Sequence, residues 1–303
     1  MHFYCERCKK EYPVATHAYA CECGGLFRLY QTAMDAEDCH EAVTLGETET
    51  PLLPLKVDGH QFFFKMEDRQ PTGSFKDRGA KRLIGELAHL GIDHVAVDSA
   101  GNAGAAVAAY AAAAGIACRV YVPDDISAER AKQIAAYGAA VIRVPNGRMN
   151  AGSTARAELG SDYYASHVYN PLFFEGMKAM AYEIYEQLGE SVPEYIFLPV
   201  GNGTMLLGLY YGFIEIGRLP RLMPVQSKNC APLYEAFNKI PASPKTETIA
   251  DSIRIETPKR LNDMLAAVTN SGGDVLIVDD EELCFGGGCG HGSILHEHPE
   301  YFL

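Results

Sequence analysis

The sequence predicts an α/β protein in which mainly parallel sheets carry helices on both faces. The main observation is the alternation of short hydrophobic strands with helical segments along most of the chain. A second observation is size, because 303 residues, 48% of them hydrophobic, suffice for a substantial core and about two domains. A third is that two strand-to-helix junctions are rich in glycine and asparagine, in the place where parallel sheets bind ligands.

Composition argues against several classes of function. The net charge is −13, with 39 acidic against 26 basic residues, so neither a nucleic-acid backbone nor an anionic membrane is an expected partner. A small anionic ligand in a local pocket stays compatible with this charge. No apolar run is long enough to span a membrane, and the N-terminus lacks the hydrophobic region of a secretion signal. Nine cysteines fit a reduced cytoplasm better than a disulfide framework, and a homodimer is left open.

Residues 1–40 form a separate segment that is dense in cysteine. Cys5, Cys8, Cys21 and Cys23 have the spacing C-x2-C-x12-C-x-C, which resembles that of a zinc ribbon. Two thiolate pairs, each on a tight turn, can complete a tetrahedral Zn²⁺ site and stabilise a segment too small for its own core. The second pair has one spacer residue where ribbons usually have two, so a ribbon that kept its cysteines without metal is the alternative.

After residue 50 the expected elements follow one another in order. Residues 51–68 are predicted to form two extended runs joined by a turn at Asp58-Gly59. Further strands are expected at 94–99, 118–123, 140–145, 163–167, 195–200, 222–227 and 274–278. Helices are expected in the Ala-rich segment 101–117, at 127–138, briefly after 145, at 173–189, from Thr204 onward and at 258–271. The Ala-rich segment is typical of a tightly packed helix rather than of a membrane span.

Two strand-to-helix junctions have the composition of ligand-binding loops. The first is "VDSAGNAGAA" at 97–106, and the second is "FLPVGNGTMLLG" at 197–208. In the second, glycines allow the backbone N–H groups of Gly201–Thr204 to surround a phosphate. A plain tight turn is the alternative for either loop alone. Neither the P-loop pattern nor the dinucleotide-binding glycine pattern occurs, which disfavours a nucleotide enzyme.

Lys76, in "PTGSFKDRG", is the candidate reactive group. A lysine in an apolar, partly dry pocket loses its proton more readily and becomes a nucleophile that can form a Schiff base with an aldehyde. Pyridoxal 5'-phosphate (PLP) needs such an amine, a phosphate-binding loop and a polar group at its phenolic oxygen. Lys76, the Gly201–Thr204 loop and Asn102 can supply these three. A solvated lysine at a helix start, paired with Asp77, is the alternative for Lys76 taken alone.

In combination, these motifs resemble those of the threonine synthase family, within the fold-type-II (tryptophan-synthase-β-like) PLP enzymes. "PTGSFKDRG" is similar to the family's lysine motif, "SAGNAGAAVAAYAAAAG" to its segment for the substrate carboxylate and the cofactor ring, and "PVGNGT" to its phosphate loop. The resemblance extends from residue 1, including the cysteine-rich segment, to about residue 283. It implies a large PLP-binding α/β domain at 41–85 and 176–303, and a smaller α/β domain at 86–175.

The resemblance also implies roles for individual residues. Lys76 would bind the cofactor covalently and later move protons, with Phe75 beside it, while Asn102 would hydrogen-bond the phenolic oxygen. The residues that would hold the cofactor phosphate are Gly201, Asn202, Gly203 and Thr204. Those that would bind the substrate carboxylate are Ser99, Gly101 and Ala103.

A second phosphate, that of the substrate, needs its own residues. Asn170 in "YNP" matches a family position for it. Ser153 and Arg156 could assist there, but exposed surface positions are the interpretation that the sequence favours for both.

The activity implied is the conversion of O-phosphohomoserine, a small anionic amino acid, and water to threonine and phosphate. A serine/threonine ammonia-lyase and a cysteate-synthase-like enzyme are the alternatives, and the Asp that follows Lys76 favours the synthase branch.

The C-terminal run "CFGGGCGHGSILHEHPEYFL" lacks the Ser- or Thr-containing segment that faces the pyridine nitrogen in this family. A catalytically impaired PLP-binding paralogue is therefore a further alternative, with a frameshift, a truncation or a divergent tail as its origin. A metal site in this tail is disfavoured; its ligands would come from Cys284, Cys289, His291, His296 and His298.

Overall fold

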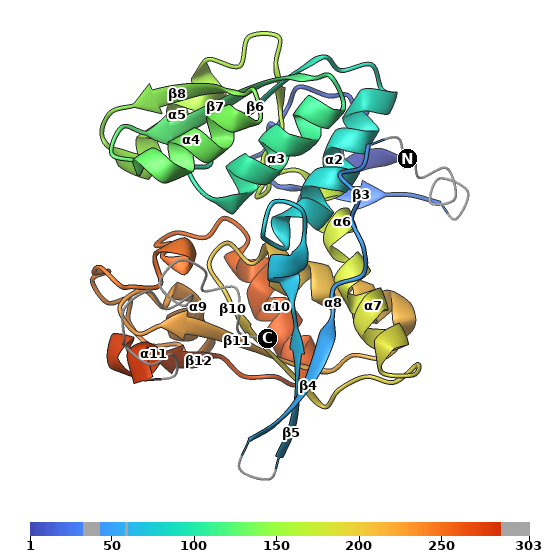
Figure 1. The fold of residues 1–303 in the computed structure, drawn as a ribbon, viewed down its shortest axis with the longest axis vertical. Coiled ribbons are helices and arrows are strands. Elements are labelled where there is room, and N and C mark those ends of the chain that lie inside the picture. Colours follow the sequence, from blue (N-terminus) through green and yellow to red (C-terminus); the bar gives the residue numbers. More distant parts are fainter. Residues whose placement is uncertain (33–42, 58–59, 286–303) are drawn as a thin grey trace. The chain divides into compact units, whose positions relative to one another are not determined.

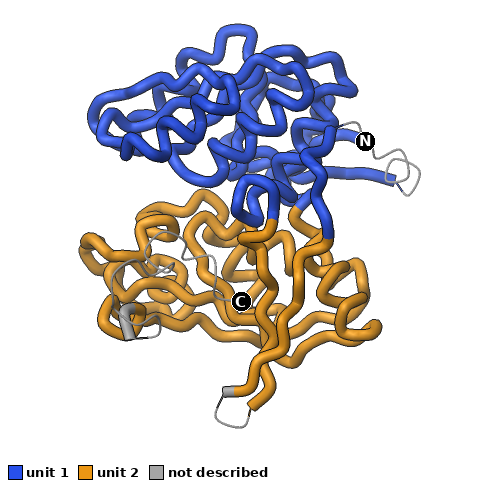
Figure 2. The backbone as a smooth tube through the Cα atoms, viewed as in Figure 1, with its two compact units in different colours: residues 1–48, 70–176 blue, residues 49–69, 177–303 orange. Residues whose placement is uncertain are grey.

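The computed structural model describes residues 1–32, 43–57 and 60–285 (Figure 1). The chain forms two compact units (Figure 2): unit 1 comprises Met1–Thr48 and Gln70–Gly176, and unit 2 comprises Glu49–Arg69 and Met177–Leu303. The division at Gly176 adjoins the boundary expected from the sequence. Residues 43–48 and 70–85, expected in the large domain, belong to unit 1 instead. For the second range the reason is that helix α2 (Lys76–His89) packs on helix α3 (Asn102–Ala113).

The cysteine-dense segment is built on a small antiparallel sheet. Its strands are β1 (His2–Cys5), β2 (Glu11–Tyr12) and β3 (Phe27–Tyr30), in the order β2-β1-β3. Phe3 and Phe27 are buried and stack with their ring centroids 5.9 Å apart. The segment is part of unit 1.

The main sheet of unit 1 is parallel throughout, as the alternation of strands and helices predicts. Its strands are β6 (His94–Val97), β7 (Ala117–Pro123), β8 (Ala140–Val144) and β9 (Tyr163–Tyr164), in the order β8-β7-β6-β9. The accompanying helices are α2, α3, α4 (Ala128–Ala136), α5 (Gly147–Ala157) and α6 (Pro171–Met177).

Helices cover both faces of this sheet. Tyr121 of β7 packs in one cluster with Ala151 of α5. The adjacent Val120 faces α3 instead, and a Cβ at Gly104 would lie 3.2 Å from its Cγ1. Successive side chains of a strand point to opposite faces, so α3 and α5 lie on opposite faces of the sheet.

The Ala-rich segment is helix α3, and its small side chains have a packing reason. A Cβ at Gly104 would lie 2.1 Å from the carbonyl oxygen of Ser99, so only glycine allows the helix to approach that loop so closely. The residues from Ala103 to Ala111 are all buried. The expectation of a tightly packed helix is confirmed. In the described ranges of the chain, no helix combines the length and the apolar character that crossing a membrane requires.

Unit 2 contains a second parallel sheet, with strands β10 (Tyr195–Pro199), β11 (Arg221–Ser227) and β12 (Leu276–Val278) in that order. Its helices are α7 (Ala179–Gln187), α8 (Thr204–Ile216), α9 (Pro232–Phe237), α10 (Leu261–Ser271) and α11 (Asp280–Phe285). The unit also contains two 3₁₀ turns, η1 (Glu67–Arg69) and η2 (Asp251–Ile253). The expected antiparallel hairpin consists of β4 (Leu52–Val57) and β5 (His60–Lys65). Its predicted turn at Asp58-Gly59 lies outside the described residues, as do the histidines and Cys289 of the C-terminal run.

The expected helix at 173–189 is wrong as a single element. The structure has two helices, α6 and α7, with a break at Lys178. The two halves pack in different units: a Cβ at Gly176 would lie 2.2 Å from the Arg78 carbonyl oxygen in unit 1, and Ala181 packs against Gly212 of α8 in unit 2. The amphipathic pattern is continuous, but the tertiary partners change in the middle of it.

Candidate active site

Lys76 is the first residue of α2 and is half-buried. Its Nζ lies 3.9 Å from the centroid of the Phe75 ring, and its backbone N–H donates to Ser74 Oγ at 3.3 Å. An ammonium group over an aromatic face is stabilised by the ring's quadrupole. Lys76 is therefore held against an apolar neighbour and is not the fully solvated lysine of the alternative interpretation.

Asp77 holds the turn from which Lys76 projects. Its side chain is fully buried, and its carboxylate accepts hydrogen bonds from the Thr72 backbone N–H at 2.7 Å and from the Thr72 hydroxyl. Between the two residues the chain passes through Gly73, which has φ +85°. A left-handed residue and a buried carboxylate cap therefore fix the backbone immediately before the reactive amine.

His167 is a residue near Lys76 that sequence analysis missed. Its ring packs edge-to-face on Phe173, with centroids 5.9 Å apart, and Phe173 lies against Gly79, one turn beyond Lys76 on α2. Burial lowers the pKa of His167 well below its ordinary value, and the positive charges of Lys76 and Arg148 lower it further. The imidazole is thus neutral, and its Nδ1 has no hydrogen-bond partner among the described residues. A single histidine in a turn gives no sequence signal of this kind.

The loop predicted to bind the substrate carboxylate closes onto the N-terminus of α3. Ser99 Oγ accepts a hydrogen bond from the Gly101 N–H at 3.4 Å, and Gly101 is the N-cap of the helix. Asn102 is the first residue of α3 and is half-buried, whereas Ala103 is buried. The positive end of a helix dipole and N–H groups without intrahelical partners suit a carboxylate at this position.

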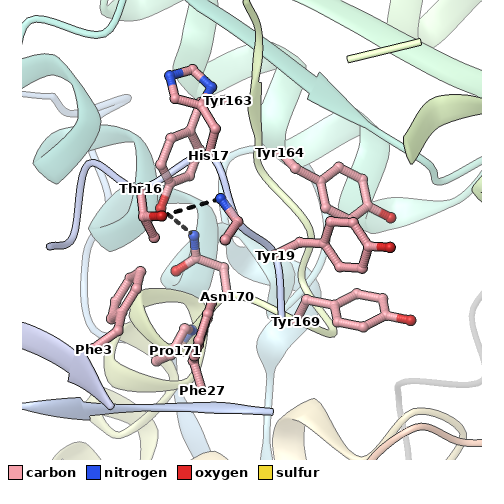
Figure 3. A pocket seen from close by; sticks show the side chains of 11 residues that line it. Phe3, Thr16, His17, Tyr19, Phe27, Tyr163, Tyr164, Tyr169, Asn170 and Pro171 are labelled. Atoms are coloured by element: carbon pink, nitrogen blue, oxygen red, sulfur yellow. Dashed lines mark hydrogen bonds between the residues drawn. The ribbon is translucent and has the colours of Figure 1, made fainter. Parts of the chain in front are cut away.

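Asn170 lies in a small pocket of unit 1 that is lined by both the cysteine-dense segment and the α/β part (Figure 3). Its Nδ2 donates to the Tyr163 hydroxyl at 2.9 Å, and its Oδ1 accepts from the Leu172 N–H at 3.0 Å. The Tyr163 hydroxyl in turn donates to the carbonyl oxygen of Val14 at 3.0 Å. The amide of Asn170 thus binds protein groups here. Ser153 is exposed, as expected, and its hydroxyl donates to backbone carbonyls of its own helix.

The predicted phosphate loop belongs to unit 2 and lies between β10 and α8. Gly203 is the N-cap of α8 with φ +79°, and a Cβ there would lie 2.2 Å from Met264 Sδ. A Cβ at Gly201 would lie 2.9 Å from Ile255 Cγ1. Within the described residues, the backbone N–H groups of Gly201, Asn202 and Gly203 donate to no protein acceptor. Such donors at the start of a long helix fit a phosphate.

The four cysteines of the N-terminal segment come together. Their sulfur atoms all lie within 4.8 Å of one another, with Cys5 and Cys23 at 3.5 Å and Cys8 and Cys21 at 3.4 Å. Four thiolates bound to one Zn²⁺ at about 2.3 Å have sulfur–sulfur edges of about 3.8 Å, which is compatible with this cluster.

Two features of the backbone and of the thiols suit metal binding. A Cβ at Gly25 would lie 2.4 Å from Cys5 Sγ, so glycine is needed beside the cluster. Hydrogen bonds from the Tyr12 hydroxyl and the Cys23 backbone lower the pKa of the Cys21 thiol to about 6. This favours the thiolate of Cys21, which is the form that binds metals. The backbone hydrogen bond at Lys10 lowers the pKa of Cys8, but hydrogen bonds with Cys21 and Cys23 outweigh it and raise that pKa to about 12, so without metal the cluster holds protons.

The chain is similar to several known proteins. The family model described as pyridoxal-phosphate dependent enzyme matches residues 43–286. A threonine synthase of Methanocaldococcus jannaschii is 32% identical over 92% of this chain and 79% of its own length, and one of Synechocystis sp. is 35% identical over 89% and 73%. The solved structure of maize serine racemase has a TM-score of 0.71 at 24% identity, over 78% of this chain and 74% of that one, and shows a shared fold.

Proposed function

Because the chain belongs to the threonine synthase family of pyridoxal-phosphate dependent enzymes, we propose that it converts O-phosphohomoserine and water to threonine and phosphate. The family makes it a PLP-dependent lyase. The observation that carries the proposal is the half-buried Lys76, whose amine lies against Phe75 on a turn fixed by Asp77. Partial burial on a fixed turn limits the hydration of the amine and holds it in one place, as attachment to an aldehyde requires.

Several residues would hold the cofactor. The Lys76 amine would bind its aldehyde carbon, and the Asn102 side chain would hydrogen-bond its phenolic oxygen. The N–H groups of Gly201, Asn202 and Gly203, with the Thr204 hydroxyl, would bind its phosphate. The close packing of the loop glycines supports this, as does the lack of an acceptor for those N–H groups among residues 1–32, 43–57 and 60–285. When bound, PLP supplies an electron-withdrawing ring that stabilises negative charge at the substrate Cα.

The chain's own residues would do the remaining work. Ser99, Gly101 and Ala103, at the N-terminus of α3, would bind and orient the substrate carboxylate. The Lys76 amine would move protons at the substrate carbons. His167 is neutral, so it adds no second cation beside that amine. Water must then add at the β-carbon after phosphate leaves the γ-carbon, which balances the reaction as threonine plus inorganic phosphate.

The cysteine cluster is proposed to hold one structural Zn²⁺. Its four thiols have a mutual spacing that suits tetrahedral coordination, and the segment contains few other buried residues to stabilise it. All four positions are then occupied by protein ligands, so this metal would stabilise the fold and take no part in the reaction.

An assay that compares three substrates tests the proposed activity. Purified protein supplied with PLP is given O-phosphohomoserine, serine or threonine in separate reactions, and phosphate, threonine and keto acids are measured. We expect phosphate and threonine in equal amounts from O-phosphohomoserine. Keto acid from serine or threonine, with no phosphate release from O-phosphohomoserine, would identify an ammonia-lyase instead. Lys76→Ala is the control that removes the amine.

A further inference from the structure

Three tyrosine rings meet where the cysteine-dense segment contacts the α/β part of unit 1. Tyr19, two residues before Cys21, contacts Tyr164 and Tyr169 edge-to-face, with ring centroids 5.7 Å and 5.3 Å apart. Figure 3 shows the Tyr19 ring between the other two, with all three hydroxyls directed to the same side. The N-terminal segment thus contributes the middle ring of the cluster.

Arg156 of α5 is fixed by these rings. Its guanidinium carbon lies 5.7 Å from the centroid of Tyr19 and 5.8 Å from that of Tyr169, and its Nη1 donates to the Tyr164 hydroxyl at 3.4 Å. Its side chain is only 24% exposed. The solvent-exposed position that the sequence favours for Arg156 is therefore wrong, because aromatic rings from distant parts of the chain surround it.

The same groups hold Asp98, the residue directly before Ser99. The Tyr164 hydroxyl donates to Asp98 Oδ1 at 2.6 Å, and Arg156 Nη1 lies 4.0 Å from Asp98 Oδ2. A Cβ at Gly152 would lie 2.6 Å from that second oxygen, so the carboxylate sits tightly against α5. Burial raises the pKa of Asp98, and the hydrogen bond from Tyr164 and the charge of Arg156 oppose this effect.

These contacts form a chain from the cysteine-dense segment to the loop at the start of α3. The Tyr19 ring limits the movement of Arg156, Arg156 and Tyr164 fix the Asp98 carboxylate, and Asp98 continues directly into the Ser99–Asn102 loop. A buried carboxylate with paired partners has one favoured position, so the first residue of the loop is anchored.

We propose that Tyr19 is a positioning residue, through which the cysteine-dense segment fixes the substrate-carboxylate loop Ser99–Asn102 by way of Arg156 and Asp98. The role of the loop in substrate binding rests on the proposed function, whereas the mechanical link does not. Loss of the Tyr19 ring removes one of the two rings that contact Arg156, so Arg156 and Asp98 are held less firmly. The loop then has to be ordered when substrate binds, which weakens substrate binding without a direct effect on the chemistry at Lys76.

Hydrogen exchange of the PLP-loaded protein without substrate tests the link independently of activity. Tyr19→Ala and Tyr19→Leu are expected to accelerate amide exchange of residues 98–104, whereas Tyr19→Phe, which keeps the ring, is not. Tyr30→Ala is the matched control, because Tyr30 lies on β3 of the same segment and stacks on His2 instead. Unchanged exchange at 98–104 in both ring-removing variants, or equal acceleration throughout unit 1, would overturn the proposal.

Steady-state kinetics and a double-mutant cycle complete the test. Tyr19→Ala is expected to raise KM for O-phosphohomoserine about fivefold, the range of an aromatic–cation contact, with kcat nearly unchanged. In an Arg156→Met background Tyr19→Ala should have no further effect on KM or on exchange. Additive effects, or a fall in kcat alone, would contradict the route through Arg156. If O-phosphohomoserine is not a substrate, the hydrogen-exchange measurement still decides the positioning role of Tyr19, while the assay with three substrates decides the activity.

Discussion

Gly203 and Met264 leave no space between them for a side chain: a Cβ at Gly203 would lie 2.2 Å from Met264 Sδ, and Met264 is fully buried. Gly203 also has φ +79°, a conformation that side chains disfavour. Both constraints act on the N-terminus of α8, beside the N–H groups of the predicted phosphate loop that have no acceptor in the described part of the chain.

Gly203→Ala is therefore expected to weaken PLP binding about tenfold or more, because the added methyl group displaces the loop from Met264. The backbone strain should also lower the free energy of unfolding by roughly 1 kcal/mol. Gly217→Ala is the matched control: it is the C-cap of the same helix with the same φ, but nothing lies within 4 Å of its Cβ position. Spectroscopic PLP titration separates the two variants, and equal PLP affinities for them would argue against the loop as the phosphate site.

Glu47 predicts an acid-dependent loss of stability. Burial would raise its pKa, but hydrogen bonds from the Thr44 and Tyr110 hydroxyls outweigh it and hold the pKa at about 2, against an ordinary 4.5. The folded state thus binds a proton less readily than the unfolded chain. The contribution of the Glu47 carboxylate to the free energy of unfolding is therefore complete above pH 4.5 and is lost as the pH falls toward 2.

In denaturant titrations at stepped pH, wild type should lose about 1–2 kcal/mol more than Glu47→Gln across this window. The glutamine variant keeps the shape of the side chain but has no proton to bind. Parallel pH profiles for the two proteins would show that the hydrogen bonds to Glu47 contribute nothing to acid stability.

His167 predicts a second pH effect, near neutrality. Its folded pKa is well below the ordinary 6.5, so the unfolded chain gains a proton first as the pH falls. The contribution of the neutral imidazole to the free energy of unfolding is then complete above pH 6.5 and decreases at lower pH. Between about pH 8 and about pH 5.5 the loss is about 1.4 kcal/mol. His167→Phe, which fills the space beside Phe173, should lack this component. If both proteins lose the same stability between the two pH values, His167 is not held neutral.

The cysteine cluster predicts metal content. Elemental analysis should find about one Zn²⁺ per chain in the wild type, and Cys8→Ser should lose it together with part of the stability of unit 1. Cys118→Ala is the control, because Cys118 is buried in β7, apart from the four-thiol cluster. Zinc retained by Cys8→Ser, or absent from the wild type purified without chelator, would favour the metal-free ribbon.

The sequence predicts well those features that local patterns determine. The strands at 94–99 and 118–123 are hydrophobic runs bounded by turns, and they become β6 and β7 of a parallel sheet. The break at Lys178 was not predicted, because the partners of the helix change there while its periodicity does not.

The candidate site shows the same limit. Lys76 and the Gly201–Thr204 loop stand in recognisable motifs, since each is a continuous stretch of chain. Tyr19 contacts rings that are far away in the sequence, and His167 lies near Lys76 only in the tertiary structure. The predicted position of Arg156 was wrong for the same reason, since one of its aromatic partners, Tyr19, comes from the distant N-terminal segment.

The central claim is that the Lys76 amine carries the cofactor. Mass spectrometry of the borohydride-reduced, digested holoprotein tests it most directly, because reduction makes the lysine–cofactor linkage permanent. We predict a pyridoxyl-modified peptide with the modification on Lys76, which disappears in Lys76→Arg together with the visible absorbance of the bound cofactor. A modification found only on other lysines, or on none in a protein saturated with PLP, would contradict the account.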